Sequence, residues 1–410
     1  MHIPFFLLSL RRNRMIRLLT IAVVLLLSIT ADAQTYRYNL KFTFSEKIFV
    51  DTIPIEYNHD QLYLPVEIKG QRLRFKLDTG SAMAVIYDDS PIRNSKELGF
   101  IQSIDATGAK RPVKVVALPP LRIGRLTVNN YPACVHRRMV RRDREDGIIG
   151  FDLFNKGLAT KIDTRNGVMI ITDQRQLLQE MSGEILRYQL KRFVPYIKIS
   201  PIAGEEETVL FDTGSRDIYT MNKQQFDNFE KKHPEISSLV EGRGYGSIAI
   251  GHFGAEHKDE IVLLALPRLL LNHFELRDIH CQSFQGNSHI GASLLRYGIV
   301  IISPFRKQLI FQSYDDPSYC MVSNPQLEIA IVPTREGKPC VGIVWEQSEA
   351  YKQGFRTGDI IEKVDGFPVT DFHSFISRSY VFDRIYAFTL RDAQGRPKEV
   401  RSTMPLLKRH

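Results

Sequence analysis

Two aspartates stand in the same four-residue motif at two places in the chain, as Asp78-Thr79-Gly80-Ser81 and Asp212-Thr213-Gly214-Ser215. Glycine lets a backbone turn closely, so each carboxyl group is expected on a tight loop. Two carboxyl groups about 3 Å apart do not both ionise easily and share one proton. The ionised member can take a proton from water while the protonated member polarises a carbonyl group. The pair of motifs therefore predicts a catalytic dyad of Asp78 and Asp212, provided that the two loops meet in space.

The surroundings of the two motifs also match. Residues 72–77 alternate polar and apolar side chains, which predicts a strand with one side facing a core and a water-facing side that carries Arg72, Arg74 and Lys76. Residues 208–211 lead into the second motif in the same way. Residues 147–154 and residues 288–295 also match each other, since each segment has the pattern of a buried strand that breaks into a short helix. The chain thus contains a duplicated β-rich unit of ordinary domain size.

The composition is that of a folded protein with more than one domain. A chain of 410 residues is too long for one ordinary core, and 43% hydrophobic with 25% charged residues is typical of globular proteins. The net charge of +9 is modestly basic. No zinc-spaced cysteines, aromatic RNA-binding motif or basic helix accompanies it, so nucleic acid is not an expected partner. The sequence has no metal-ligand cluster and no serine–histidine nucleophile motif, so neither a metal nor another cofactor is expected.

Residues 1–33 have the pattern of a secretory signal peptide. Four arginines precede 12 apolar residues, and Ala31-Asp32-Ala33 offers a cleavage site. A membrane anchor is the alternative, but this apolar stretch falls short of the ~20 residues that span a bilayer. We therefore expect an exported protein, whether periplasmic, at the cell surface or secreted, without a stable membrane span after cleavage.

The chain has four cysteines, Cys134, Cys281, Cys320 and Cys340. Disulfides persist in exported proteins, and three complete pairings are possible. A Cys320–Cys340 bond is attractive because these two residues are close in sequence. Small buried thiols without any disulfide are the alternative.

Residues from about 60 to 312 resemble the aspartic protease superfamily, and the short repeats resemble its retropepsin-like branch, fused in tandem. The markers are the two Asp-Thr-Gly-Ser motifs together with Gly147-Ile148-Ile149-Gly150 and His289-Ile290-Gly291. The resemblance implies a mainly β fold with a bilobal β-barrel architecture, in which two duplicated lobes bring Asp78 and Asp212 together.

The same resemblance implies roles for the residues that follow each aspartate. Thr79 and Thr213 are expected to hydrogen-bond across the lobe interface, with Gly80 and Gly214 in the turns. Ser81 and Ser215 are expected to support the outer carboxylate oxygens. A hydroxyl group that donates to a carboxylate lowers its pKa, so we expect an acidic pH optimum.

Enzymes of this kind cover the cleft with hairpin flaps. In the first repeat the candidate tip is residues 104–110, with Thr107 and Gly108 at its centre. In the second repeat the candidate is residues 242–254, with Gly244, Tyr245 and Gly246 as flap candidates, and the sequence does not fix where its tip lies. Ordinary surface turns are the alternative for both. The basic run at residues 136–144 is predicted to be a solvated loop, with a subsite for acidic side chains as the alternative.

The last part of the chain resembles a PDZ domain. Residues 348–354 fit a Ser-x-Ala-x-x-x-Gly helix, and Gly358-Asp359 and Val364-Asp365-Gly366 follow. PDZ domains capture extended peptides by strand addition at a sheet edge. The usual glycine-rich carboxylate-binding loop is missing or altered, so a module that only braces the protease is the alternative.

These patterns predict four segments: a signal peptide at 1–33, a first lobe at 34–180, a second lobe at 184–316 and a small α+β PDZ-like domain at 325–402. The predicted function is an exported aspartic endopeptidase that acts on peptides or proteins, monomeric because its pseudo-dimer is internal. The PDZ-like domain is expected to assist substrate recognition and is a candidate peptide binder. The alternative is a catalytically silent peptide-binding or scaffold protein of the same fold.

Overall fold

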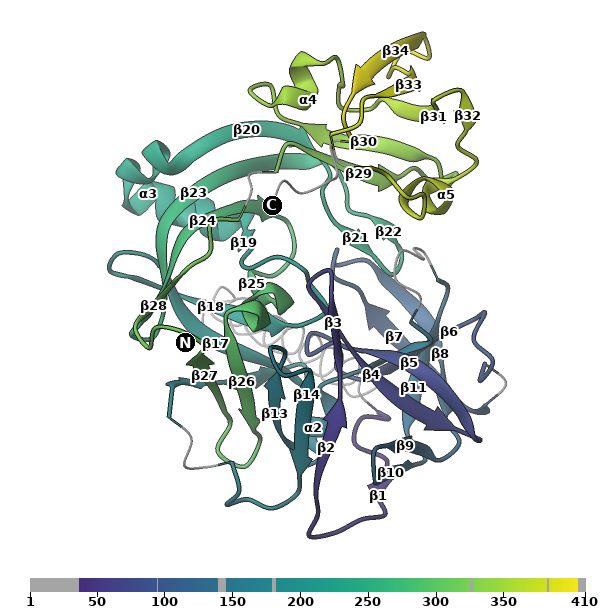
Figure 1. The fold of residues 1–410 in the computed structure, drawn as a ribbon, viewed down its shortest axis with the longest axis vertical. Coiled ribbons are helices and arrows are strands. Elements are labelled where there is room, and N and C mark those ends of the chain that lie inside the picture. The colour runs from purple at the N-terminus through teal and green to yellow at the C-terminus, as the bar shows by residue number, and fades with distance from the viewer. Residues whose placement is uncertain are drawn as a thin grey trace, which may run out of the picture.

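The computed structural model describes residues 37–404, except for residues 94, 139–144, 179–181, 325–326 and 382. The predicted signal peptide and most of the basic run therefore lie outside the described residues. Within the described part of the chain, no helix is both long enough and apolar enough to cross a membrane. The fold is mainly β, as predicted, and its sheets curl into a half-barrel (Figure 1).

The first repeat forms one curved sheet, whose strand pairing confirms the predicted alternation. Leu73, Phe75 and Leu77 are buried on β5, and Phe75 lies opposite Leu64 of the neighbouring strand. In spatial order the strands are β1 (Thr43–Phe44), β10 (Leu126–Asn129), β9 (Leu121–Ile123), β4 (Gln61–Ile68), β5 (Gln71–Leu77), β12 (Gly147–Ile149), β6 (Ala84–Tyr87), β11 (Pro132–His136), β8 (Lys110–Ala117) and β7 (Lys96–Ile104), with β3 (Glu56–Asn58) beside β4. The short helix α2 (Asp152–Asn155) follows β12, as predicted.

The second repeat forms a second sheet with the same central pairing. Its strands are β19 (Met221–Asn222), β24 (Phe274–Phe284), β23 (Asp259–Leu271), β17 (Val194–Ile202), β18 (Glu205–Asp212) and β25 (His289–Gly291), with β16 (Gln189–Lys191), β20 (Val240–Gly246) and β28 (Tyr319–Met321) at its edges. β18 runs parallel to β25, as β5 runs parallel to β12. Both aspartates therefore leave the same position of an equivalent strand pair.

Three short helices complete the second repeat: α3 (Lys223–Lys232), η1 (Pro234–Leu239) and η2 (Ala292–Arg296). Asn222 caps α3 by accepting a hydrogen bond from the Gln225 amide. Phe226 and Phe229 form the buried side of α3. The helix therefore covers the second sheet with one apolar face.

A third sheet takes strands from both repeats. Its order is β15 (Glu184–Arg187), β27 (Gln308–Ser313), β26 (Gly298–Ser303), β13 (Ala159–Asp163), β14 (Val168–Thr172) and β2 (Val50–Pro54). The central pairing joins β13 of the first repeat to β26 of the second, with Ile162 opposite Val300. The two repeats consequently share one continuous apolar core.

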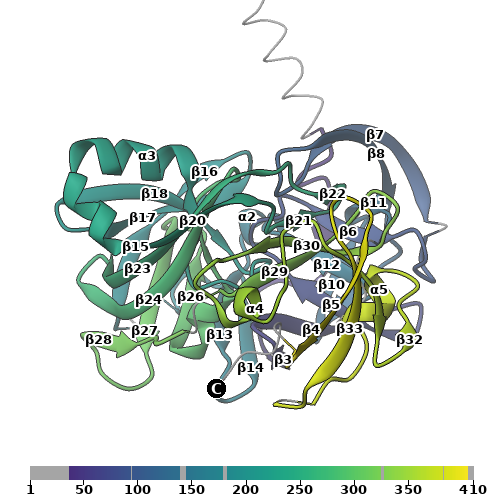
Figure 2. The same ribbon diagram turned by 90° about the horizontal axis from the view of Figure 1, so that it is seen from above.

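The C-terminal module, residues 327–404, has a separate core around Phe355, Phe375 and Leu390. Its sheet contains β29 (Ile329–Pro333), β30 (Pro339–Val344), β31 (Ile360–Val364), β33 (Tyr386–Arg391) and β34 (Pro397–Ser402), with β32 (Phe367–Pro368) beside β31 and helices α4 (Glu349–Lys352) and α5 (Phe372–Ile376). The hairpin of β21 (Ile250–Gly251) and β22 (Gly254–Ala255) lies between this module and the first sheet in Figure 1. Seen from above in Figure 2, β29 and β30 lie over β20, β21 and β22, and β30 contacts β20 while β29 contacts β22.

All four cysteines carry free thiols. Cys134 and Cys281 are buried inside the two sheets, whereas Cys320 lies in β28 and Cys340 in β30. The structure therefore favours the alternative of unpaired thiols over a Cys320–Cys340 disulfide.

Candidate active site

Both aspartates are held at the ends of buried strands. The Asp78 amide donates to the Ile149 carbonyl at 3.0 Å, which anchors the first loop to β12. Asp212 is the last residue of β18 and lies opposite Gly291 in the parallel pairing with β25. Leu77 and Phe211, which precede the two aspartates, are each 1% exposed. The strands that carry the carboxyl groups are therefore fixed by the core.

Thr79 and Thr213 tie the two loops together. The Thr79 amide donates to the Thr213 hydroxyl at 3.0 Å, and the Thr213 amide donates to the Thr79 hydroxyl at 2.9 Å. Each hydroxyl also donates to a carbonyl of the opposite repeat, from Thr79 to Phe211 at 2.6 Å and from Thr213 to Leu77 at 2.8 Å. Both threonines are completely buried. The four reciprocal bonds fix the distance between the two motifs.

The two glycines show where the carboxyl groups lie. A methyl group added to Gly80 would stand 2.5 Å from Cγ of Asp212, and one added to Gly214 would stand 2.4 Å from Cγ of Asp78. Each carboxyl group therefore packs directly on the glycine of the opposite loop. The Gly214 amide also donates to Oδ1 of Asp212 at 2.8 Å. The two aspartates meet across the junction of the repeats, and only a residue without a side chain leaves room for them.

The electrostatics of the pair favour one shared proton. Burial and then the charge of Asp78 raise the pKa of Asp212. The charge of His289, the Gly214 amide and the charge of Lys76 oppose this rise. A carboxyl group whose pKa is raised by a second carboxylate is the group that keeps its proton at mildly acidic pH.

The two serines of the motifs are not placed as expected. The Ser81 hydroxyl donates to the Met83 carbonyl at 2.7 Å, and the Ser215 hydroxyl pairs with Nε2 of His289 at 2.9 Å. Ser81 closes its own turn because the chain bends back at Met83 directly after the motif. His289 takes the Ser215 hydroxyl because β25 runs beside β18 and carries the imidazole to that loop.

Lys76 differs from its predicted place in water. Its side chain is only 16% exposed, and Nζ lies 3.8 Å from Oδ2 of Asp78. Strand alternation places it correctly on the face opposite Leu77. That face is not solvent, however, because the hairpin of β21 and β22 comes down upon it from the second repeat.

The first flap candidate lies in the turn between β7 and β8, which contains Thr107 and Gly108. Oδ1 of Asp105 accepts from the amides of Thr107 and Ala109 at 3.0 and 3.1 Å, and from the Thr107 hydroxyl at 2.7 Å. Gly108 adopts a φ of +79°, which this tight turn requires. The turn is therefore ordered by one carboxylate.

The three flap candidates of the second repeat do not lie at the tip of a hairpin. Gly244, Tyr245 and Gly246 lie inside β20, paired with β23, and Tyr245 is 65% exposed. The actual tip is His252 and Phe253, in the turn between β21 and β22. The glycines in β20 are there because the C-terminal module packs closely upon that strand, as a methyl group on Gly246 would lie 2.3 Å from the Gly342 carbonyl oxygen.

The tips of the two hairpins touch. The Phe253 amide donates to Oδ2 of Asp105 at 2.9 Å. The His252 ring lies 4.4 Å from the ring of buried His136 on β11. Phe253 also packs against the apolar cluster of Val85, Val115, Ile148 and their neighbours, on the face of the first sheet that carries Lys76. The second hairpin is therefore seated on the first repeat, next to the aspartates.

The stacked histidines predict a pH-dependent contact. Burial and then the charge of His252 lower the pKa of His136 to about 3, while burial and then Lys76 lower the pKa of His252 to about 4. Opening the hairpin would expose both rings and let them take up protons below pH ~6.5. The closed contact is thus fully stable above pH ~6.5 and weakens as the pH falls towards these lowered values. We expect the Phe253 amide to lose protection from hydrogen exchange between pH 6.5 and 5.

A double variant, His136→Phe with His252→Phe, should remove this pH dependence, because phenylalanine keeps the stacked rings without a titrating group. The Thr79 amide, bonded inside the core, is the internal control for the change in intrinsic exchange rate. Equal pH dependence at Phe253 in the wild type and in the double variant would contradict the prediction.

The described end of the basic run is not a free loop. The Arg138 guanidinium lies 3.8 Å from the centre of the Tyr87 ring, and Nε is 3.1 Å from Oδ1 of Asp89. Its side chain is 5% exposed, so this residue braces the sheet. The alternative for this run is a subsite for acidic side chains. It depends mainly on residues 139–144, which lie outside the described residues.

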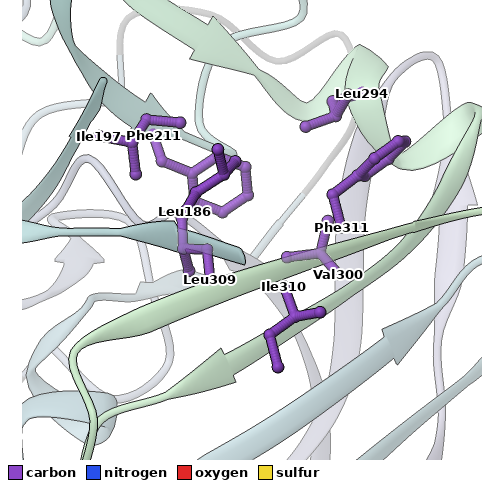
Figure 3. A pocket seen from close by; sticks show the side chains of 8 residues that line it. All are labelled: Leu186, Ile197, Phe211, Leu294, Val300, Leu309, Ile310 and Phe311. Atoms are coloured by element: carbon purple, nitrogen blue, oxygen red, sulfur yellow. The ribbon is translucent and has the colours of Figure 1, made fainter. Parts of the chain in front are cut away.

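A small apolar pocket lies in the core of the second repeat and is not the candidate site. Figure 3 shows the eight side chains that line it, all of them apolar: Leu186, Ile197, Phe211, Leu294, Val300, Leu309, Ile310 and Phe311. With no polar group to orient a ligand, it is a packing defect behind Phe211 rather than a binding site.

The sequence analysis did not predict that the two aspartates have charged or titratable neighbours. These neighbours are Lys76, His252 and His289. A signal for one of them exists in the repeat itself. Lys76 stands two residues before Asp78, where the second repeat has Leu210 two residues before Asp212. No comparable signal marks His252, whose place depends on how a long hairpin folds back.

Comparison with known proteins agrees with this geometry in the first repeat. Searching the curated proteins gave no match. The model of the aspartyl protease family matches residues 64–153, which include Asp78 and run through β12. This match supports an aspartic-type peptidase.

Proposed function

We propose that this chain is an aspartic endopeptidase in which Asp78 and Asp212 together activate one water molecule. The observation that carries the proposal is the reciprocal contact of each carboxyl group with the glycine of the opposite motif. Two separate aspartates give no such arrangement, whereas a dyad that shares one proton requires it. The four threonine bonds support the proposal because they hold both loops in this geometry.

The reaction would proceed by acid–base catalysis without a covalent intermediate. One carboxylate takes a proton from the water as its oxygen bonds to the peptide carbonyl carbon. The other carboxyl group gives its proton to the carbonyl oxygen, whose π electrons form the new O–H bond. The resulting tetrahedral diol collapses when the first carboxyl group passes the proton from water to the amide nitrogen, and the electrons of the C–N bond leave with that nitrogen. A diol hydroxyl gives its proton to the second carboxylate as the C=O bond re-forms, so the dyad again holds one proton. Two products with a free carboxyl and a free amino end leave the cleft.

The two hairpins would serve this chemistry by excluding water and by pairing with an extended peptide. Their tips meet at the bond between the Phe253 amide and Asp105. Burial and then the charge of Lys76 lower the pKa of His252, so this tip lies near Lys76, the partner of Asp78. Substrates of the proposed enzyme are therefore extended peptide segments of unfolded or flexible proteins. Export, a monomeric state and a PDZ-like role of the C-terminal module remain part of this proposal.

A peptide-library digest tests the proposal. Purified chain without residues 1–33 should cleave internal bonds of the library at mildly acidic pH, and a statine-type inhibitor, which resembles the tetrahedral diol, should block this cleavage. Digestion in H₂¹⁸O should place one ¹⁸O atom in each new carboxyl end. No cleavage between pH 3 and 8 would instead favour a catalytically silent peptide-binding protein.

A further inference from the structure

We propose that Lys76 is a positioning residue that makes Asp78 the ionised base of the dyad and leaves the shared proton on Asp212. The inference rests on the proposed function and assigns the two roles that it leaves open. Nζ of Lys76 lies 3.8 Å from Oδ2 of Asp78, and both side chains are at least four-fifths buried, at 16% and 13% exposure. A cation at this distance in a poorly solvated site stabilises the carboxylate form of its neighbour.

The second repeat provides an internal comparison. Leu210 occupies the position equivalent to Lys76, and it is buried and uncharged. Across the parallel strand pairs, Lys76 lies opposite Ile148, whereas Leu210 lies opposite His289. In the pair of Leu210 and His289, the basic group is thus the imidazole of His289. Its Nε2 is hydrogen-bonded to the Ser215 hydroxyl. The charge of Lys76 also reaches Asp212, but Lys76 forms its ion pair with Asp78, and this difference breaks the symmetry of the duplicated site.

Other titratable groups face the pair and do not undo this asymmetry. They are His252 from the β21–β22 turn, His289 from β25, Tyr87 from β6 and Tyr196 from β17. The tyrosines are neutral in the working range, since burial raises the pKa of each. His252 is also neutral there because its pKa is lowered to about 4. Lys76 is therefore a positive charge paired with Asp78 at 3.8 Å, and none of these four groups carries a charge that cancels it.

The pH profile of kcat/KM tests the assignment, because its acid limb reports ionisation of the base in the free enzyme. Lys76→Leu, which copies the second repeat, should move the acid limb to higher pH by about one unit. Lys76→Arg should keep the limb in place because it keeps the charge. Lys198→Leu is the matched control, since Lys198 is 66% exposed and pairs with Glu206 on the surface.

The outcomes separate this inference from the proposed function. An unmoved acid limb in Lys76→Leu, with Asp78→Asn inactive, overturns the role of Lys76 and leaves the dyad. If Lys76→Leu has no activity, retained activity in Lys76→Arg supports the role of the charge, and equal loss in both overturns it. Undiminished cleavage by Asp78→Asn would remove the dyad itself.

A separate set of contacts carries a second inference: we infer that the C-terminal module holds the β21–β22 hairpin closed over the dyad. Trp345, at the end of β30, is 2% exposed and packs with Ile343 against Ile261 and Leu263 of β23. The Ser247 amide, between β20 and β21, donates to the Gly342 carbonyl at 3.1 Å. The module is therefore joined to the strand that leads into the hairpin.

The hairpin itself also touches the module. Ile250 of β21 packs against the module core, and β22 lies against β29, the edge strand of the module sheet. On its other side the hairpin places His252 and Phe253 on the first repeat. It is thus clamped between the module and the cleft, and an extended peptide cannot enter beneath it without moving it.

The docked state is suited to reversible opening. Nε1 of Trp345 is buried without a hydrogen-bond partner among the described residues. An unpaired buried N–H group disfavours the docked state. Undocking lets this group bond to water, which offsets part of the packing free energy that undocking loses. Trp345 is the only tryptophan of the chain, so its fluorescence reports on this interface alone.

Two variants should undock the module by different means. Trp345→Ala removes the packing, and Gly246→Ala places a methyl group 2.3 Å from the Gly342 carbonyl oxygen and 2.8 Å from Cβ of Ile343, at the junction with the module. Each should raise kcat/KM for a short library peptide by at least about threefold, because opening populates the accessible state. The Phe253 amide should exchange faster in both. Tyr245→Ala, on the exposed face of the same strand, is the control and should change neither value.

Where the wild type cleaves the peptide, a rise of kcat/KM in either variant supports the latch, and no rise in either overturns it. Red-shifted Trp345 emission in Gly246→Ala should accompany the rise. If the wild type and both variants cleave nothing, faster exchange at Phe253 would retain the latch and remove the proposed function. Unchanged exchange at Phe253 in both variants would overturn the latch independently of any cleavage.

Discussion

Replacing either dyad aspartate by asparagine is expected to abolish peptide cleavage, with a loss of kcat of at least about 10³-fold. Asparagine has the shape of aspartate, so it can still pack on the opposite glycine. It cannot, however, accept a proton from water or give one to a carbonyl oxygen. Asp78→Asn and Asp212→Asn should therefore fail equally, and the double variant should be no worse than either single variant because the pair acts as one unit.

Stability provides the control for this result. Burial and then the charge of Asp78 raise the pKa of Asp212, so the second carboxylate disfavours the charged form of the first. Removing one carboxylate relieves that repulsion, so each variant should unfold at the same temperature as the wild type or slightly above it. A substantially lower Tm would mean that activity was lost through misfolding. Normal Tm together with full activity would contradict the dyad.

Thr79→Val is expected to lower both stability and activity. The Thr79 hydroxyl accepts from the Thr213 amide and donates to the Phe211 carbonyl, and both partners are deeply buried. Valine fills the same space but can neither accept from the Thr213 amide nor donate to the Phe211 carbonyl, at a cost of about 3 kcal/mol in the free energy of unfolding. Because the lost bonds bridge the two motifs, kcat should fall along with the urea midpoint.

Thr79→Ser is the matched control, since serine keeps the hydroxyl and loses one methyl group, at a cost of about 1 kcal/mol. Thr213→Val should reproduce the effect of Thr79→Val, because the Thr213 hydroxyl makes the reciprocal bonds. A Thr79→Val variant as stable and as active as Thr79→Ser would show that the cross-connection does not hold the site.

Much of the fold was predictable because it depends on local patterns. Strand alternation at residues 72–77 and the matched segments at 147–154 and 288–295 identified the strand pairs that carry the aspartates. The threonine bonds were predictable only through resemblance, since no local rule brings Thr79 to Thr213. The mainly β class followed from many such short segments.

What could not be predicted depends on contacts distant in sequence. A glycine-rich stretch predicts a turn, but the glycines of β20 instead make room for the backbone and side chains of the C-terminal module. The alternation of polar and apolar residues predicts which side chains lie on each face of β5. It does not predict what packs on the polar face. Lys76 was therefore assigned to water, although a hairpin far along the chain covers it. Ser215 pairs with His289, which is also distant in sequence, whereas Ser81 donates within its own turn to Met83, a local bond that the resemblance does not predict.

The central pairing of β13 with β26 has an evolutionary consequence. A homodimer built from one repeat would place the same residue beside both aspartates, since symmetry copies every substitution. Here a single polypeptide contributes both halves to one sheet, so each half can change alone while the other keeps its register. Joining the halves is what permits a lysine on one side and a leucine on the other.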